Sequence, residues 1–230
     1  MKIVLLVALA IAPCLAIIFY IYHRDKFEKE PKGLLILTFF LGVLSIVPAI
    51  FLEEFLWKQP GIADHAYLRA TVGTGLVEEG SKLLFILILP FWRKAFNEPL
   101  DGIIYSMMVS MGFATVENIM YVVQGGFGIG VLRVFTAVPA HAIFAVVMGY
   151  YIGLAKFNKK WKVPYILLGY LLAGSFHGAY DYFLMENQVP GIWIGAIVSL
   201  IAGVILAFRA IRLHRKRSEV IHHLHDLPNE

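Results

Sequence analysis

The chain has 230 residues, of which 59% are hydrophobic and 16% are charged, and its mean hydropathy is +0.73. A soluble core of this size cannot bury so much apolar surface, whereas a lipid bilayer accepts it, so the composition excludes an ordinary soluble domain. The net charge of +4 does not indicate nucleic-acid binding, because Lys and Arg fall in short segments between apolar runs, where they orient membrane helices. The single cysteine, Cys14, excludes an intrachain disulfide.

Seven apolar runs are long enough to be interpreted as transmembrane helices, because about 20 helical residues cross the hydrocarbon core of a bilayer. The sequence therefore predicts an all-α, polytopic membrane protein with a single membrane domain at residues 1–208 and a basic cytoplasmic tail at residues 209–230. In chain order, the predicted spans are residues 3–22, 34–52, 71–91, 103–123, 132–155, 163–184 and 192–208.

Three local features add detail to this outline. Glu53 and Glu54 end the second run, and we interpret them as solvated charges at the membrane boundary. The glycine-rich residues 125–130 follow no predicted strand, so they indicate a turn and not a phosphate-binding loop. Pro139 is expected to loosen the helix two residues before His141, because a proline inside a helix removes a backbone N–H donor.

The distribution of positive charge predicts the orientation. Fifteen of the 20 Lys and Arg residues lie in the first, third and fifth loops and the tail, against four on the other side, and Lys82 lies within the third run. Cytoplasmic loops carry the excess of Lys and Arg. We therefore expect the N-terminus outside the cell and the C-terminus in the cytoplasm.

Four of the apolar runs carry ionisable side chains. Such groups are costly inside a bilayer, so they normally face a protein interior or water and mark a functional pathway. In the predicted orientation they all lie roughly 5 to 14 Å below the outer membrane boundary, at about 1.5 Å per helical residue. We therefore expect one polar cluster in the outer leaflet, formed by Glu78 and Glu79, by Glu117, by His141, and by His177 and Asp181.

Helical spacing predicts how these groups pair. His177 and Asp181 are four residues apart and share a helix face, as do Glu78 and Lys82. A Glu78–Lys82 pair would leave Glu79, about 100° around the helix, free to face the cluster.

Three motifs in this order resemble those of the PrsW family of bacterial intramembrane proteases. They are E-E-x-x-K at residues 78–82, F-x-x-x-E at residues 113–117 and H-x-x-x-D at residues 177–181, with shorter matches at residues 101–105, 139–142 and 149–153. The resemblance implies a multi-pass protease of the bacterial cell membrane. It also implies that the substrate is a membrane-anchored anti-sigma factor, which receives its first, extracytoplasmic-side cut here, so that a sigma factor is eventually released.

On these motifs we assign the expected roles. Glu79 is the expected general base for a water molecule, with Glu78 as its partner or replacement and His177 as an acid/base or a ligand. Lys82, Phe113 and Asn118 are expected to support the site or to position substrate and water. A divalent metal, with zinc as the preferred ion, is expected because a catalytic zinc needs three nitrogen or oxygen ligands and an open position. The expected ligands are Glu117, His141, His177 and Asp181.

The sequence leaves alternatives open. Close carboxyl groups can share protons and activate water without a metal, so a metal-free glutamate mechanism remains in view. The motifs are more distantly similar to the CAAX prenyl endopeptidase and peptide-processing superfamily. Intramembrane acids and histidines also form proton or cation pathways in transporters, although spans three to six show no further acid or histidine in their inner halves. A non-catalytic membrane scaffold is the remaining interpretation.

Overall fold

The computed structural model describes residues 2–25, 28–186 and 190–225, and this part of the chain is helical without a strand. The long helices are α1 (Lys2–Arg24), α2 (Lys32–Leu56), α5 (Pro99–Phe135), α6 (Ala137–Phe157), α7 (Lys162–Met185) and α8 (Trp193–His225). Between α2 and α5 lie α3 (Ala66–Ala70), the π-helix η1 (Thr71–Gly75), α4 (Leu76–Ile88) and the 3-10 helix η2 (Pro90–Trp92). The all-α fold class is therefore confirmed.

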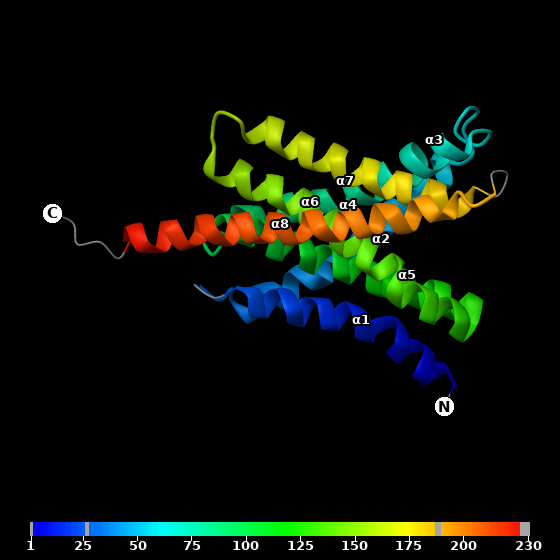
Figure 1. Cartoon of the computed structure of the whole chain (residues 1–230), viewed down its shortest axis with the longest axis horizontal. Helices are drawn as coiled ribbons and strands as arrows, with labels where there is room; N and C mark the ends of the chain where they lie inside the picture. The colour runs from blue at the N-terminus through cyan, green and yellow to red at the C-terminus, as the bar shows by residue number, and fades with distance from the viewer. Residues whose placement is uncertain (1, 26–27, 187–189, 226–230) are drawn as a thin grey trace.

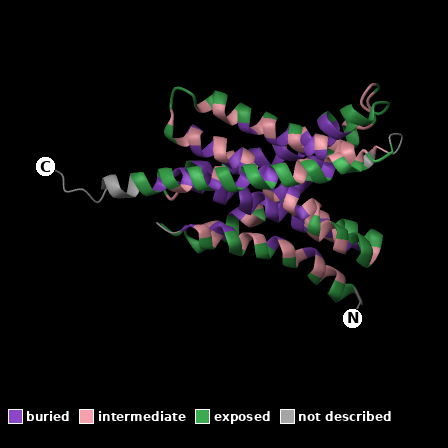
Figure 2. Ribbon diagram, viewed as in Figure 1, coloured by how far each residue is buried: buried purple, intermediate pink, exposed green. Residues whose placement is uncertain are grey.

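Helix α5 occupies the centre of the bundle, where it packs against α1, α2 and α6 (Figure 1). Every residue of α5 from Pro99 to Thr115 is buried. The helix begins with a well-formed N-terminus, since Pro99 occupies the first turn and Asp101 Oδ2 accepts the backbone N–H of Glu98 at 2.8 Å. Figure 2 shows the same pattern, with buried residues at the middle of the bundle and exposed ones along α1 and α8.

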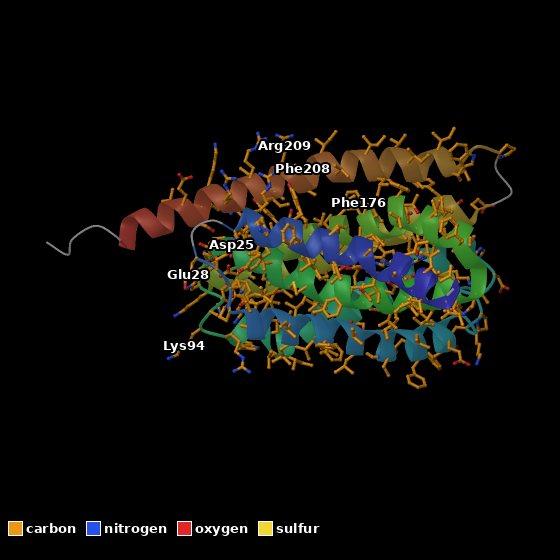
Figure 3. The ribbon with its side chains drawn as sticks, turned by 90° about the horizontal axis from the view of Figure 1, so that it is seen from below. Asp25, Glu28, Lys94, Phe176, Phe208 and Arg209 are labelled. Carbon is orange, nitrogen blue, oxygen red and sulfur yellow. The ribbon has the colours of Figure 1, made fainter. Side chains whose placement is uncertain are left out.

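The ends of the helices alternate between the two ends of the bundle. The N-terminal ends of α2, α5 and α7 lie at the end toward which α8 extends its C-terminal part, and α1 begins at the opposite end (Figure 1). Figure 3 places Asp25, Glu28 and Lys94 at the same end as the C-terminal part of α8. This arrangement agrees with the predicted alternation of the loops, while the side of the membrane on which each end lies stays a prediction.

Four helical stretches are long and apolar enough to cross a membrane: Ile3–Arg24, Lys32–Leu56, Pro99–Phe157 and Trp193–Val220. The third contains 59 residues and comprises both α5 and α6, so it holds two of the predicted spans. Large apolar side chains such as Ile3, Phe51 and Phe135 are exposed on the outside, which suits contact with lipid. The polytopic membrane architecture is thus confirmed, and the crossing of all seven predicted segments stays a prediction.

Of two local expectations about the α5–α6 region, one is confirmed and one was wrong. The chain turns within residues 125–130, because Gly126, whose φ of 74° suits only a residue without a side chain, interrupts α5, and the helical residues after it fold back until Arg133 contacts Glu117 at 2.8 Å. Pro139 does not loosen the helix near His141, because it lies in the first turn of α6. A backbone N–H in that turn has no partner within the helix, so its absence costs little.

The basic C-terminal segment continues a membrane helix. Helix α8 runs without interruption from Trp193 past Phe208 to His225, so the predicted tail at residues 209–230 begins as part of that helix. His214 is buried there, where its ring stacks on Tyr150 at a centroid distance of 4.3 Å. The last residues, 226–230, lie outside the described part of the chain.

A group of carboxylates is buried at the end of the bundle where α5 begins. Asp25, Glu30 and Glu98 are at most 4% exposed, and the Tyr105 hydroxyl donates a hydrogen bond to Glu30. Burial, followed by the negative charges of Asp25 and Glu30, raises the pKa of Glu98 to about 7. These acids therefore make the packing at this end sensitive to pH.

Candidate active site

The ionisable residues of four helices meet in one place, as predicted. We call this group the polar cluster. It consists of Glu78, Glu79 and Lys82 from α4, Glu117 from α5, His141 from α6, and His177 and Asp181 from α7. Residues 63 positions apart along the chain, His141 and Glu78, belong to it, so it depends on the tertiary fold and not on any single helix.

Close packing of backbones brings α4 to α7. A Cβ atom on Gly75 would lie 2.5 Å from the backbone nitrogen of Gly178, and one on Gly178 would collide with Thr71. Only glycine at both positions lets η1 and α7 approach this closely. Because Gly178 follows His177 and Gly75 precedes Glu78 by three residues, this contact sets the acidic pair against the histidine.

Lys82 lies between the other members of the polar cluster. Its Nζ donates to Glu79 Oε1 at 2.7 Å and to Glu78 Oε2 at 3.2 Å, and it lies 3.1 Å from His141 Nδ1. The same ammonium lies 4.1 Å from the ring centroid of Phe113. The expectation that Lys82 would neutralise Glu78 alone was wrong, because the shorter contact is with Glu79.

Glu117 orients His141. The Nε2 atom of His141 lies 2.7 Å from Glu117 Oε2, so the opposite ring nitrogen, Nδ1, points toward Lys82 and the acidic pair. Arg133 Nη2 lies 2.8 Å from the same carboxylate oxygen. Glu117 is therefore held from two sides and is positioned behind the imidazole.

His177 contacts carboxylates on both sides of its ring. Its Nδ1 lies 3.1 Å from Glu79 Oε1, and its Nε2 lies 3.4 Å from Asp181 Oδ2, as the i,i+4 spacing predicted. Phe144 stacks on the ring with a centroid distance of 4.7 Å and an interplanar angle of 19°. The ring is thus fixed in both position and plane.

Four buried groups of the cluster can hold a metal ion. One ligand atom from each of Glu78, Glu79, His141 and His177 lies within 4.8 Å of the others. Glu79 Oε2 is buried and accepts no hydrogen bond from the described residues, and Lys82 already sets a positive charge where three of the donors converge. Two imidazoles and carboxylates form a donor set that zinc accepts, so these residues fit such an ion. The group includes His141 and His177 from the expected ligands, whereas Glu117 and Asp181 lie behind the two imidazoles.

A cavity of about 620 Å³ opens beside the polar cluster. Its volume is within the range of about 300–1,000 Å³ found for ligand sites. Glu78, His141 and His177 contribute to its wall, together with apolar side chains such as Ile46 and Leu132. Glu79 does not line the cavity and is fully buried, so of the adjacent acids it is Glu78 that faces the space a ligand can enter.

The acidic pair at the end of α2 divides into two different environments. Glu54 is exposed and pairs with Lys58 at 2.7 Å, which agrees with its interpretation as a solvated charge, while its position at the membrane boundary stays a prediction. The same interpretation was wrong for Glu53, which lines the cavity and whose Oε1 is shielded from solvent. The α2 helix continues to Leu56, and one turn of its inner face therefore reaches the site.

The sequence did not predict the contacts that Asn118 and Arg133 make. Asn118 was expected to position substrate or water, but its side chain accepts a hydrogen bond from Arg133 Nε at 2.6 Å and donates to Ala10 O at 3.3 Å. It therefore holds Arg133, which in turn contacts Glu117. Arg133 was counted only as a loop charge, and the break in α5 at Gly126 is what turns the chain back and brings Arg133 to the site.

Comparison with known proteins gives consistent matches over most of the chain. The profile of the family described as "PrsW family intramembrane metalloprotease" matches residues 30–211. Curated proteins named "Protease PrsW" are similar to it. The one from Geobacillus kaustophilus is 35% identical over 83% of this chain and 84% of its own length.

Two further relatives carry the same name. The protein from Clostridioides difficile is 37% identical over 87% of this chain and 86% of its own length, and that from Bacillus subtilis is 33% identical over 78% and 82%. No solved structure matches the chain.

Proposed function

Since the chain belongs to the PrsW family of intramembrane metalloproteases, we propose that it makes the first, extracytoplasmic-side cut in a membrane-anchored anti-sigma factor. The family establishes a multi-pass bacterial membrane protein that hydrolyses peptide bonds. The substrate and the side of the cut are the proposed part. The resemblance of the three motifs and the predicted outer-leaflet position of the polar cluster support them.

The observation that carries the proposal is the buried Glu78–Glu79–His141–His177 group beside a cavity. Hydrolysis of a peptide bond requires a base for water, a means of polarising the carbonyl group and room for the peptide. The group supplies two carboxylates and two imidazoles, and the largely apolar cavity suits part of a single membrane-spanning peptide. Ionisable groups gathered inside a membrane mark a functional site, and membership of a protease family supports proteolysis, not ion transport, as that function.

We assign the proton transfer to Glu78, because it faces the cavity. Its carboxylate takes a proton from the attacking water and delivers it to the amide nitrogen that leaves. Lys82 contacts Glu78 Oε2 at 3.2 Å and keeps this carboxylate oriented. This assignment replaces Glu79, the base expected from the sequence, whose carboxylate is held by Lys82 and His177 away from the cavity.

Glu79, His141 and His177 are the residues that would hold a divalent ion, with zinc as the proposed metal. Such an ion, when bound, supplies a Lewis acid for the carbonyl group and lowers the pKa of a water molecule to about 7. Glu117 and Asp181 would then orient the two imidazoles from behind, at 2.7 Å and 3.4 Å respectively. Carboxylates in this position behind a ligating histidine fix the tautomer and the plane of the ring.

The test is cleavage by purified protein in liposomes. A candidate membrane-anchored anti-sigma factor from the same bacterium, with its membrane helix and ectodomain intact, is added, and the products are identified by mass spectrometry. We expect one defined cut on the extracytoplasmic side. The candidate anti-sigma factor could stay intact while the same preparation cleaves another single-span peptide. That result would refute the proposed substrate and retain the protease activity.

The metal is tested on the same preparation. Elemental analysis should find about one divalent ion per chain, a chelator should abolish cleavage, and added zinc should restore it. Fully active protein without a stoichiometric metal would eliminate the proposed ion. The site would then depend on its carboxylates and histidines alone.

A further inference from the structure

Glu53 is a carboxylate of the cavity wall to which the proposed chemistry gives no role. It projects from the last turns of α2, while the polar cluster comes from α4 to α7. Its Oε1 is shielded from solvent and accepts no hydrogen bond from the described residues. None of the ion pairs found within the described ranges includes it, whereas the neighbouring Glu54 is paired with Lys58.

The charges around the cavity determine what this carboxylate can accept. Its wall contains the carboxylates of Glu53, Glu78, Glu117 and Asp181, with Glu79 directly behind them, and the exposed Glu54 lies at its edge, paired with Lys58. The fixed cations at the site are Lys82 and Arg133, and each of them already contacts other carboxylates. A divalent ion held by the inner group would offset charge there, but it would leave Glu53 unpaired.

An unpaired carboxylate in a membrane cavity is costly, and a positive partner lowers that cost. An anionic peptide group is disfavoured by the surrounding carboxylates. An apolar side chain would bury Glu53 without giving it a partner. A neutral hydroxyl or amide would donate a hydrogen bond without offsetting the negative charge, so the peptide group that meets both needs is a cation.

We propose that Glu53 forms a specificity subsite that binds a Lys or Arg side chain of the peptide substrate. The inference rests on the proposed proteolysis and adds to it the kind of sequence that is recognised. Because Glu53 and Glu78 line one cavity of about 620 Å³, the cation belongs within a few residues of the bond that is cut. The remaining lining is largely apolar, so the cation is expected among apolar residues near the membrane surface.

The test uses sets of three single-span peptides. The three peptides of a set differ at one position near the cut, and that position is changed from one set to the next. They carry Lys, Met or Glu there, so length is similar and charge differs. At the position that reaches Glu53, kcat/KM should be about tenfold higher for the Lys peptide than for the Met peptide and lowest for the Glu peptide. The difference should appear in KM, because Glu53 binds the peptide without taking part in the chemistry.

The variants separate recognition from a structural role. Glu53→Gln should remove the advantage of the Lys peptide, Glu53→Asp should restore part of it, and Glu53→Lys should favour the Glu peptide. Glu54→Gln is the matched control, since it changes the adjacent carboxylate, which is exposed and paired with Lys58, and it should keep the preference for Lys. An equal loss with all three peptides in Glu53→Gln would overturn the subsite and make Glu53 a structural residue.

Binding keeps the inference testable if the chosen peptides are not cut. In the inactive Glu79→Gln background, the Lys peptide should bind about tenfold more tightly than the Met peptide, and Glu53→Gln should abolish the difference. Equal binding of the three peptides would refute the subsite. Charge-dependent binding by the Glu79→Gln protein, combined with no cleavage of any peptide by the unaltered protein, would instead count against the proposed proteolysis. The subsite would still be supported.

Discussion

His141 and Glu117 form the shortest contact between α5 and α6 within the polar cluster, with 2.7 Å between Nε2 and Oε2. The histidine thereby presents Nδ1 to the acidic pair. The relationship makes Glu117 an orienting residue, and its effect can be measured separately from that of a ligand. Arg133 contributes to the same arrangement through its 2.8 Å contact with Glu117.

We expect Glu117→Gln to lower activity or metal affinity by about 10- to 100-fold, the range known for carboxylates behind metal-binding histidines. The amide keeps the shape of the side chain but loses the charge that holds both His141 and Arg133. Metal affinity and kcat/KM should be measured together. The control is Arg133→Lys, which keeps the positive charge and should have the smaller effect. Unchanged metal affinity and activity in Glu117→Gln would show that His141 needs no such support.

The adjacent acids should behave differently when each is replaced. Glu79→Gln and His177→Ala should lose both cleavage and bound metal while the protein still accumulates in the membrane. Glu78→Gln should lose cleavage by at least about 100-fold yet retain the metal, because the general acid/base contributes about 10²–10⁴-fold. Elemental analysis of the three variants checks this division. If the Glu78→Gln protein lacked metal and the Glu79→Gln protein were fully metallated, Glu78 would be the metal ligand and Glu79 the proton-transfer residue.

The glycine contact between η1 and α7 should be sensitive to a single methyl group. In Gly178→Ala the new Cβ meets the backbone of Thr71, so α7 must move away and His177 with it. We expect a loss of cleavage of about 100-fold, because a misplacement of about 1 Å can have that effect. Gly33→Ala is the control, since nothing lies within 4 Å of a Cβ there. A fully active Gly178→Ala would mean that the contact does not set the position of the histidine.

Stability should fall as the pH rises through about 7. The pKa of Glu98 is raised from 4.5 to about 7, so the folded protein favours its protonated form, and this stabilisation is lost when the carboxyl ionises. Burial also raises the pKa of Asp25 and of Glu30, which act in the same direction. Melting temperature in detergent should therefore drop between pH 5 and pH 8, by about 2–4 °C for each kcal/mol lost.

The variant Glu98→Gln isolates one part of this pH effect. It should show a smaller drop in melting temperature than the unaltered protein, because the amide does not ionise. Glu54→Gln should keep the full drop, since that side chain is exposed. Identical pH profiles for the unaltered protein and Glu98→Gln would assign the effect to other groups.

Orientation in the membrane is checked with reporter fusions. Fusions after Lys162 and Arg217 should report the cytoplasm, and a fusion after Gln59 should report the outside, because the basic segments favour the cytoplasmic side. The opposite pattern would place the polar cluster in the inner leaflet. The substrate would then be cut from the cytoplasmic side.

Much of the site could be predicted because its chemistry contradicts its surroundings. Glu78, Glu117 and His177 interrupt apolar runs, and charge in the loops fixes the relative depth of those runs. Glu53 gave no such signal, since a carboxylate at the end of a span normally faces water. Both acids line the cavity, and only the packing of α2 distinguishes them, because it shields Oε1 of Glu53 from solvent while Glu54 stays exposed and paired with Lys58.

Other differences arise from local geometry that composition does not report. Glycines at residues 125–130 predicted a turn, but the pattern did not show that a single residue, Gly126, makes it and brings Arg133 back to Glu117. The orientation of Glu78 relative to Glu79 could not be settled from the spacing alone. The two residues are only 100° apart, so the rotation of α4 about its own axis decides which of them faces the cavity, and the spacing does not fix that rotation.

The π-helix η1, which precedes the acidic pair, helps to determine the direction in which Glu78 and Glu79 point. The N–H of Leu76 bonds to the carbonyl oxygen of Thr71, five residues earlier, so this turn holds one residue more than a regular α-helical turn. If all five residues of Thr71–Gly75 were kept but wound as a regular α-helix, the extra residue would rotate all of α4 by about 100° relative to α3. A chain can therefore contain every motif residue and still aim its carboxylates away from His177, because the spacing upstream of the motif decides which side of the helix faces inward.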